Sequence, residues 1–208
     1  MAVGDVIKFF AAPNIRPRGI TWDGKTLWHC DSNIDRIYQI NAITGAVIRD
    51  FASPDLEPTG ITWDGKTLWI ATDNLNRIYQ VNPITGAVIK FFASPTTFPR
   101  DLAWDGLTLW NAERLTDRIY QINPITGAVI KWFAAPNGEP TGLTWDGKTL
   151  WNCDLTTGDV YQVNPITGAV IRFFASPADD PRGLAWDGKT LWLTTDDLNV
   201  FYQLEMHS

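Results

Sequence analysis

The sequence predicts a closed five-bladed β-propeller, and three observations lead to that prediction. The chain consists of five units of 41 residues, each unit holds four short apolar segments separated by turn residues, and the two ends of the chain carry complementary parts of one unit. Four strands in a period of about 40 residues are typical of a propeller blade. An apolar period of 3.6 residues, which a helical solenoid would need, is not found.

The 41-residue period is carried by three aromatic series that keep their register without insertion or deletion. The first is a tryptophan followed by Asp-Gly, at Trp22, Trp63, Trp104, Trp145 and Trp186. The second is Trp28, Trp69, Trp110, Trp151 and Trp192, and the third is Tyr38, Tyr79, Tyr120, Tyr161 and Tyr202. Because the tryptophans recur at fixed strand positions, we expect them to form the core, and we expect the same of Trp132.

The second unit illustrates the four expected strands. We place them at residues 60–64, 67–71, 77–81 and 87–92, where β-branched and aromatic residues are bounded by turn residues. Asp64-Gly65 between the first two favours a tight hairpin, because these residue types tolerate positive φ. The sequence Asn-Pro-Ile-Thr-Gly at residues 82–86 makes a longer turn, and Pro95 and Pro99 mark the crossover to the next unit.

The termini predict how the ring closes. Residues 3–10 match the fourth strand of a unit, whereas the fifth unit ends after its third strand at residues 200–204. Pairing these two strands would complete the fifth blade and cover an exposed sheet edge. We therefore expect one propeller domain at residues 1–204, followed by a tail at residues 205–208 that matches no position of the repeat.

Composition and charge exclude several classes of protein. The net charge is −6, the isoelectric point is about 4.8, and no run of Lys or Arg is present, which argues against nucleic-acid binding. The N-terminus lacks the features of a secretory signal, and no apolar stretch approaches the roughly 18 residues of a membrane span. We expect a soluble monomer that binds neither nucleic acid nor membranes, and the compartment is left open.

The loops divide between two faces of the expected propeller. The turns after the first and third strands lie on one face and are nearly identical in all units, whereas the crossovers and the loops after the second strands lie on the other, which we call the variable face. The variable-face loops hold 15 of the 23 acidic residues but only 8 of the 17 basic ones. Because binding sites often lie on loops held by a rigid scaffold, we expect a small molecule, a glycan or a protein to bind this acidic face. Drift without function is the alternative.

Four residues are candidates for a site at the expected mouth of the central tunnel. Arg18, Arg100 and Arg182 share one repeat position, where the other two units have Thr. Their guanidinium groups would hold a carboxylate, a phosphate or a sulfated sugar by forked hydrogen bonds, unless each pairs with an acid instead. Asp101 follows at a position where the other four units have Gly, and would place a carboxylate at the tunnel mouth.

Three further acids share the position three residues after the second tryptophan: Asp31, Glu113 and Asp154. Carboxylates there could contribute to a Ca²⁺ site, which takes six to eight oxygen ligands, but only three of the five units qualify, and capping of the turn is the alternative. Clustered His or Cys ligands for a catalytic zinc ion are absent, as are a P-loop, a dinucleotide fingerprint and a Ser-His-Asp set. We therefore predict no metal, no cofactor and no catalytic residue.

The single histidine of the repeats and the two cysteines favour structural roles. His29 is expected to form a hydrogen bond between blades rather than to act as a base. Cys30 and Cys153 occupy the same position in the first and fourth units. In a ring of five blades they would be too far apart for a disulfide, and we expect two buried thiols.

The repeat resembles the blades of NHL-like and glutamine-cyclotransferase-like propellers over essentially the whole chain. The motif that carries the resemblance is PTGITWDGKTLW, followed by RIYQVN and TG, within residues 58–86. Plant-type glutaminyl cyclases share the five-bladed architecture and use a glutamate beside the tunnel with other polar residues. The resemblance would assign such a role here only to Asp101 and Glu113. Virginiamycin lyases, which the chain resembles less, have seven blades and depend on a histidine that this tunnel region lacks.

Three functional hypotheses follow. The first is a non-enzymatic binding or scaffold module that uses the variable face around the central tunnel. The second is an enzyme of the glutaminyl cyclase or lyase type, with Asp101 and Glu113 as its acids. The third is a recently amplified or designed scaffold that has no ligand, which the near-identity of the units suggests.

Overall fold

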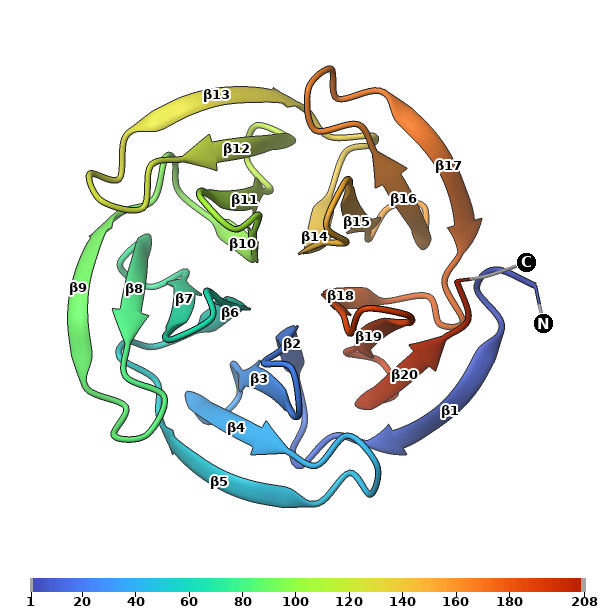
Figure 1. Ribbon diagram of the computed structural model, residues 1–208, viewed down its shortest axis with the longest axis horizontal. Helices are drawn as coiled ribbons and strands as arrows, with labels where there is room; N and C mark the ends of the chain where they lie inside the picture. The colour runs from blue at the N-terminus through green and yellow to red at the C-terminus, as the bar shows by residue number, and fades with distance from the viewer. Residues whose placement is uncertain (1, 207–208) are drawn as a thin grey trace.

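The computed structural model describes residues 2–206, and these form twenty strands in five four-stranded antiparallel sheets. Figure 1 shows the sheets arranged as blades around a central axis, with the first strand of each blade at the axis and the fourth on the circumference. The predicted five-bladed β-propeller is confirmed. Where the sequence predicts strands at residues 60–64 and 67–71, the observed strands are Pro58–Trp63 and Leu68–Thr72, a shift of one or two residues.

The strands follow the 41-residue register in every blade. Blade 1 comprises β2 (Pro17–Trp22), β3 (Leu27–Asp31), β4 (Arg36–Ile40) and β5 (Val47–Ala52). Blade 2 comprises β6 (Pro58–Trp63), β7 (Leu68–Thr72), β8 (Arg77–Val81) and β9 (Val88–Ala93). Blade 3 comprises β10 (Pro99–Trp104), β11 (Leu109–Glu113), β12 (Arg118–Ile122) and β13 (Val129–Ala134). Blade 4 comprises β14 (Pro140–Trp145), β15 (Leu150–Asp154), β16 (Asp159–Val163) and β17 (Val170–Ala175), and blade 5 comprises β18 (Pro181–Trp186), β19 (Leu191–Thr195), β20 (Val200–Leu204) and β1 (Val6–Ala11).

A hydrogen-bond network explains why Asp, Thr, Trp and Gln recur in every blade. In blade 2 the carboxylate of Asp64 accepts hydrogen bonds from the Thr67 N–H (2.6 Å), the Thr67 hydroxyl (2.6 Å) and the Trp69 indole N–H (2.9 Å). Gln80 on β8 donates to the Thr67 hydroxyl at 2.8 Å. Partial burial raises the pKa of Asp64, but these donors outweigh it and hold the pKa below its ordinary value. The network ties the first hairpin to the third strand, and Gly65 at φ +94° completes the hairpin turn.

The core lies between the blades rather than within them. Residues 2–206 contain five clusters of buried side chains, and each cluster joins two adjacent blades. Glycines of the outer turns allow the blades to approach closely, because a Cβ added to Gly45 would lie 2.9 Å from the ring of Phe10 in the preceding blade. Gly4 holds the equivalent place against Phe174, where the added Cβ would lie at 2.6 Å. The junction that contains the chain termini is therefore built like the others.

The ring closes as the termini predict. β1 pairs antiparallel with β20, with Phe9 opposite Tyr202 and Phe10 opposite Phe201. The expectation that the tail lies outside the repeat is wrong for its first two residues. Glu205 exchanges backbone hydrogen bonds with Gly4 and Asp5, as the equivalent Asn41 does with Gly45 and Ala46, and Met206 is 4% exposed in the cluster between blades 4 and 5. Residues 207–208 lie outside the described residues.

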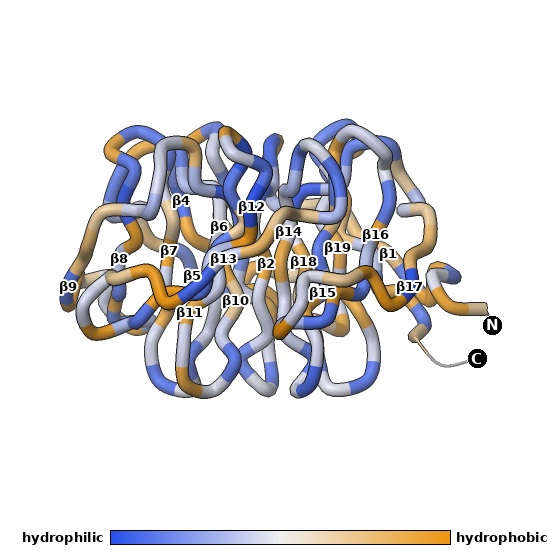
Figure 2. Tube along the Cα trace, turned by 90° about the horizontal axis from the view of Figure 1, so that it is seen from above, coloured by the Kyte–Doolittle hydropathy of each residue, from blue (hydrophilic) through white to orange (hydrophobic). Residues whose placement is uncertain are grey.

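The circumference of the propeller exposes aromatic side chains, including one that the sequence places in the core. Trp132 on β13 is 50% exposed, so its assignment to the core is wrong; its ring instead covers the Arg118 guanidinium, 3.6 Å from the ring centroid. The side chains that hold the same place on β1, β9 and β17 are also exposed phenylalanines, because the fourth strand has no neighbour on its outer side. Seen from the side, hydrophobic residues form a band at mid-height, and hydrophilic turns cover the two faces (Figure 2).

Candidate functional site

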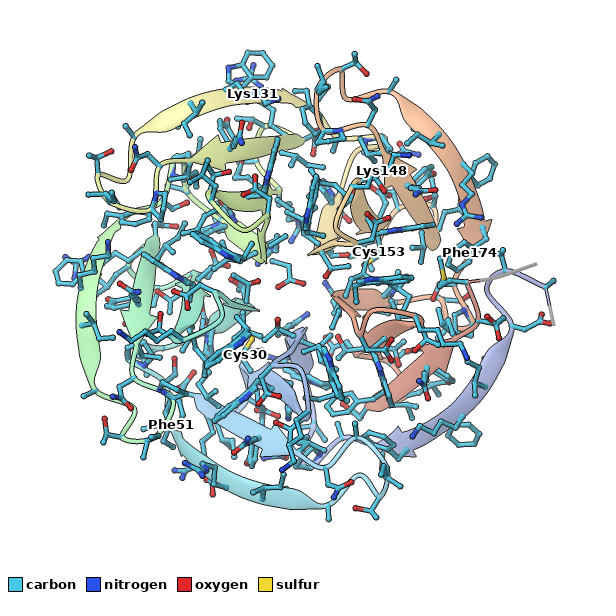
Figure 3. The ribbon with its side chains drawn as sticks, viewed as in Figure 1. Cys30, Phe51, Lys131, Lys148, Cys153 and Phe174 are labelled. Atoms are coloured by element: carbon cyan, nitrogen blue, oxygen red, sulfur yellow. The ribbon has the colours of Figure 1, made fainter. Side chains whose placement is uncertain are left out.

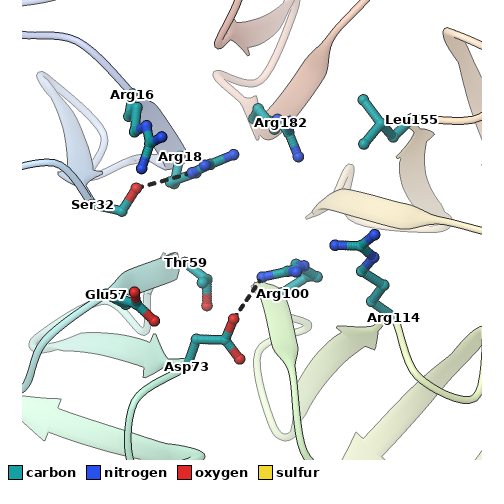
Figure 4. A pocket seen from close by; sticks show the side chains of 10 residues that line it. All are labelled: Arg16, Arg18, Ser32, Glu57, Thr59, Asp73, Arg100, Arg114, Leu155 and Arg182. Carbon is teal, nitrogen blue, oxygen red and sulfur yellow. Dashed lines mark hydrogen bonds and ion pairs between the residues drawn. The ribbon is translucent and has the colours of Figure 1, made fainter.

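A cavity of about 380 Å³ opens at the centre of the variable face, and we call it the mouth cavity. Its lining comes from all five blades (Figure 4): Arg16, Arg18, Ser32, Glu57, Thr59, Asp73, Arg100, Arg114, Leu155 and Arg182. All ten residues occupy three repeat positions. Two of these positions precede the glycine of the first strand or its equivalent, and the third lies at the start of the loop after the second strand. The cavity is thus built where the five units differ most.

The three arginines predicted at the tunnel rim do line one cavity. Arg18, Arg100 and Arg182 are each partly buried, with side-chain exposures between 15% and 21%. Burial lowers the pKa of Arg18 and of Arg100, and neighbouring arginines lower it further. Since nearby positive charges raise one another's free energy, an anion placed between these groups would relieve their repulsion.

Each of these arginines also contacts an acid. Arg100 Nη1 lies 3.1 Å from Asp73 Oδ2 of blade 2, and Arg18 Nη1 lies 3.1 Å from Asp196 Oδ2 of blade 5. Arg182 pairs within its own blade, with Nε 2.6 Å from Asp180 Oδ1. Each of the three arginines therefore pairs with an acid, which is the alternative prediction for these residues. Two of the pairs join neighbouring blades, and the third lies within one blade. A guanidinium has five N–H donors, so these contacts leave donors for a ligand.

The cavity also contains residues that the sequence analysis does not single out. Arg16 and Arg114 bring the lining to five arginines against two acids, Glu57 and Asp73, although the variable face as a whole is acidic. The acidic excess thus does not describe the centre of that face. Neither residue could be assigned from the repeat, because the equivalent positions hold unrelated residue types. Only the folded structure shows that Arg16 and Arg114 line the same cavity.

Arg114 also borders a second cavity of about 350 Å³, which we call the side cavity and which is lined by Phe98, Arg114 and Leu115. Phe98 and Leu115 are exposed apolar side chains, at 46% and 60%. Arg114 itself pairs with Glu139, with Nη2 2.6 Å from Oε1. An arginine that borders both a polar cavity and a cavity with two exposed apolar side chains suits a ligand whose charged and apolar parts are adjacent.

The prediction that Asp101 lies at the tunnel mouth is wrong. The residue lies on the central axis, beneath the mouth cavity. Its side chain is fully buried, and its carboxylate accepts four backbone hydrogen bonds from four different blades. The donors are the N–H groups of Ile61 (3.1 Å), Leu102 (2.9 Å), Leu143 (3.1 Å) and Leu184 (3.2 Å). Burial raises the pKa of Asp101 well above its ordinary value, and the four donors act in the opposite direction by favouring the charged form.

The three acids after the second strands are engaged in turns. Asp31 Oδ1 accepts hydrogen bonds from the Asn33 and Ile34 N–H groups, at 2.9 and 3.1 Å. Asp154 makes the equivalent bonds to Thr156 and Thr157, and Glu113 bonds to the backbone of Leu115 and Thr116. These are turn caps, the alternative considered for them. Within residues 2–206 no group of three His, Cys, Asp or Glu side chains could hold a metal ion. That the protein binds no metal stays a prediction.

His29 and the two cysteines lie in the packed interior. His29 is fully buried, stacks on Tyr38 with ring centroids 5.1 Å apart, and contacts Phe201 of blade 5. Burial lowers its pKa to about 3, so the ring is neutral. Cys30 and Cys153 are free, buried and on different blades, as expected (Figure 3).

Comparisons with known proteins support the fold. No protein-family model matches the sequence, and no curated protein matches it either. Among solved structures, glutaminyl cyclase from Myxococcus xanthus has a TM-score of 0.81 at 12% identity, over 98% of this chain and 97% of that one. Virginiamycin B lyase from Staphylococcus aureus has a TM-score of 0.57 at 21% identity, over 95% of this chain and 69% of that one, and a catalytically inactive variant of it with quinupristin scores 0.61 at 17% identity, over 95% and 83%.

These likenesses define the chain as a five-bladed propeller with the fold of a glutaminyl cyclase. The resemblance to glutamine-cyclotransferase-like propellers, read from the repeat motif, is confirmed at the level of the fold. At these identities the likeness does not extend to chemistry. The part of the chain that the structure describes contains no helix long and apolar enough to span a membrane.

Proposed function

We propose that this propeller is a binding module for a small organic anion, one that carries a carboxylate or phosphate next to an apolar group. The observation that carries the proposal is the convergence of five arginines on one cavity. Forked hydrogen bonds from guanidinium groups suit the geometry of carboxylate and phosphate oxygens. A cavity of about 380 Å³ falls within the size range of sites for small molecules.

The ligand's apolar part is assigned to the side cavity. Because Arg114 lines both cavities, an anionic group held by Arg114 and Arg100 would bring an attached ring or alkyl chain against Phe98 and Leu115. Burying such a group contributes about 25 cal/mol per Å² of apolar surface. The apolar part would therefore add affinity that a bare inorganic anion lacks.

A second candidate, an enzyme of the glutaminyl cyclase type, is favoured by the fold likeness over nearly the full length of both chains. Its acids would be Asp101 and Glu113. Both already accept backbone hydrogen bonds, and Asp101 is fully buried, which is unfavourable for contact with a substrate. Formation of a cyclised product from a peptide with N-terminal glutamine, lost in Asp101→Asn, would favour this candidate over the binding module.

Isothermal titration calorimetry with four probes tests the proposal: phenyl phosphate, benzoate, inorganic phosphate and benzylamine. We expect phenyl phosphate and benzoate to bind, inorganic phosphate to bind more weakly, and the cation benzylamine not to bind. The matched variant Arg100→Thr/Asp73→Ser installs the residues that blade 4 and blade 1 hold at these positions, so that no acid is left unpaired. This variant should bind phenyl phosphate about tenfold more weakly, because it loses about the free energy of one hydrogen bond to a charged group.

Two results would contradict the proposal. One is benzylamine binding as tightly as phenyl phosphate, because the cavity would then select for apolar groups alone. The other is unchanged affinity in the double variant.

A further inference from the structure

The inner strands of the propeller present a ring of backbone N–H groups to the central axis. In four of the blades the residue after the glycine position donates its backbone N–H to Asp101; these residues are Ile61, Leu102, Leu143 and Leu184. Oδ1 receives the first two and Oδ2 the last two. Converging backbone N–H groups form anion-binding concavities in proteins, and here the anion is part of the chain.

The remaining glycines explain why one carboxylate, and no more, stands on the axis. A Cβ added to Gly19 would lie 2.6 Å from Asp101 Oδ1, and a Cβ added to Gly60 would lie 2.5 Å from the Cα of Asp101. A Cβ on Gly183 would lie 2.3 Å from the backbone oxygen of Arg18. A second side chain at this level would therefore collide with the first or with the backbone of the next blade.

We infer that the N–H ring at the axis is an anion-binding site of the fold, and that Asp101 is its resident ligand. The carboxylate links four blades through one side chain and closes the axis below the mouth cavity. The repeat supports this reading, since Asp101 is the sole departure from glycine at a position where the backbone geometry favours glycine. The inference concerns the axis alone and does not depend on what binds at the mouth.

Replacing Asp101 by the residue of the other blades tests the inference, because Asp101→Gly removes the acetate-like part of the side chain. We expect the melting temperature to fall by about 10 °C, as for a loss of several hydrogen bonds to a charged group. Sodium acetate at 0.1 M should then raise the melting temperature of the variant by several degrees more than that of the wild type, through binding to the folded state. Stabilisation of Asp101→Gly by acetate no greater than that of the wild type would overturn the inference.

A second variant covers the case in which Asp101→Gly does not fold. Asp101→Asn keeps the volume of the side chain but removes its charge and replaces one acceptor by a donor. In this variant the amide protons of Ile61, Leu143 and Leu184 should exchange with solvent at least about tenfold faster than in the wild type, and acetate should not restore them, since the site is filled. Unchanged exchange at these amides would show that the carboxylate does not hold the ring.

Discussion

Arg100 of blade 3 and Asp73 of blade 2 form an ion pair across the blade boundary, with Nη1 3.1 Å from Oδ2. Both side chains are mostly buried, at 15% and 14% exposure, and both line the mouth cavity. The same two repeat positions hold Arg18 and Asp196 at the junction of blades 1 and 5. The acids thus keep the arginines of the mouth in place and also compete with any anionic ligand for them.

Removing the competing acid should strengthen anion binding. Asp73→Ser installs the residue that blade 1 has at this position, Ser32, which accepts a hydrogen bond from Arg18 Nε at 3.0 Å. We expect this variant to bind phenyl phosphate about three- to tenfold more tightly than the wild type, because a freed guanidinium bonds to the ligand. Titration calorimetry at low and at moderate salt measures the effect. Equal or weaker binding by Asp73→Ser would mean that the pair serves packing alone.

His29 should make the protein sensitive to acid. Its pKa is about 3 in the folded chain and near 6.5 when exposed, so below pH 6.5 the unfolded state binds a proton that the folded state does not. Stability therefore falls as the pH falls, by up to about 1.4 kcal/mol per pH unit.

The repeat supplies the matched control for this prediction. His29→Asn installs the residue of blades 3 and 4, where Asn152 donates to the Gly142 and Cys153 carbonyl oxygens at 2.8 and 3.1 Å. Urea unfolding of the wild type and the variant at pH 7 and pH 4.5 measures the difference. The wild type should lose about 2–3 kcal/mol more than the variant between these values. Equal losses would contradict a neutral His29 in the folded state.

The closing strand offers a pair of adjacent phenylalanines as a test of ring closure. Phe10 contacts Trp192 and Phe201, with ring centroids 5.8 and 5.5 Å apart, whereas Phe9 is 67% exposed. Phe10→Ala should lower the free energy of unfolding by about 3 kcal/mol or more, and Phe9→Ala by less than about 1 kcal/mol. Denaturant unfolding measures both. Similar, small losses would show that β1 contributes little to closing the ring.

The two thiols should be unreactive in the folded protein. Burial raises the pKa of Cys153 to about 12 and that of Cys30 well above its ordinary value, and the thiolate is the reactive form. Ellman's reagent at pH 8 should detect two thiols in the denatured protein and none within an hour in the native one. Rapid labelling of the native protein would mean that the blades around Cys30 or Cys153 open readily.

The scaffold could be predicted from the sequence because each blade repeats the same set of side-chain contacts. The network of Asp64, Thr67 and Trp69 and the contact of Trp69 with Phe92 in the same blade recur at an interval of 41 residues, so their spacing alone carries the information. The exposure of Trp132 could not be read in this way. The repeat identifies the fourth strand but does not show that nothing covers its outer side.

The candidate site was predictable only in part. Arg18, Arg100 and Arg182 share a repeat position, which places them on one ring. Arg114 joins them from a position that holds Ser, Asp or Leu in other blades, and its place depends on how the loop folds. For Asp101 the sequence marks the departure from glycine, but the depth of the side chain and its four N–H donors follow from distances across the axis.

The position of a bound ligand would test the proposed function most directly. Crystals soaked in 4-bromobenzoate, with the bromine located by its anomalous signal, would show both ends of the molecule. We expect bromine in the side cavity against Phe98 and Leu115, with the carboxylate on Arg114 or Arg100. Bromine bound outside both cavities, or no bound molecule at a concentration well above the dissociation constant measured in solution, would contradict it.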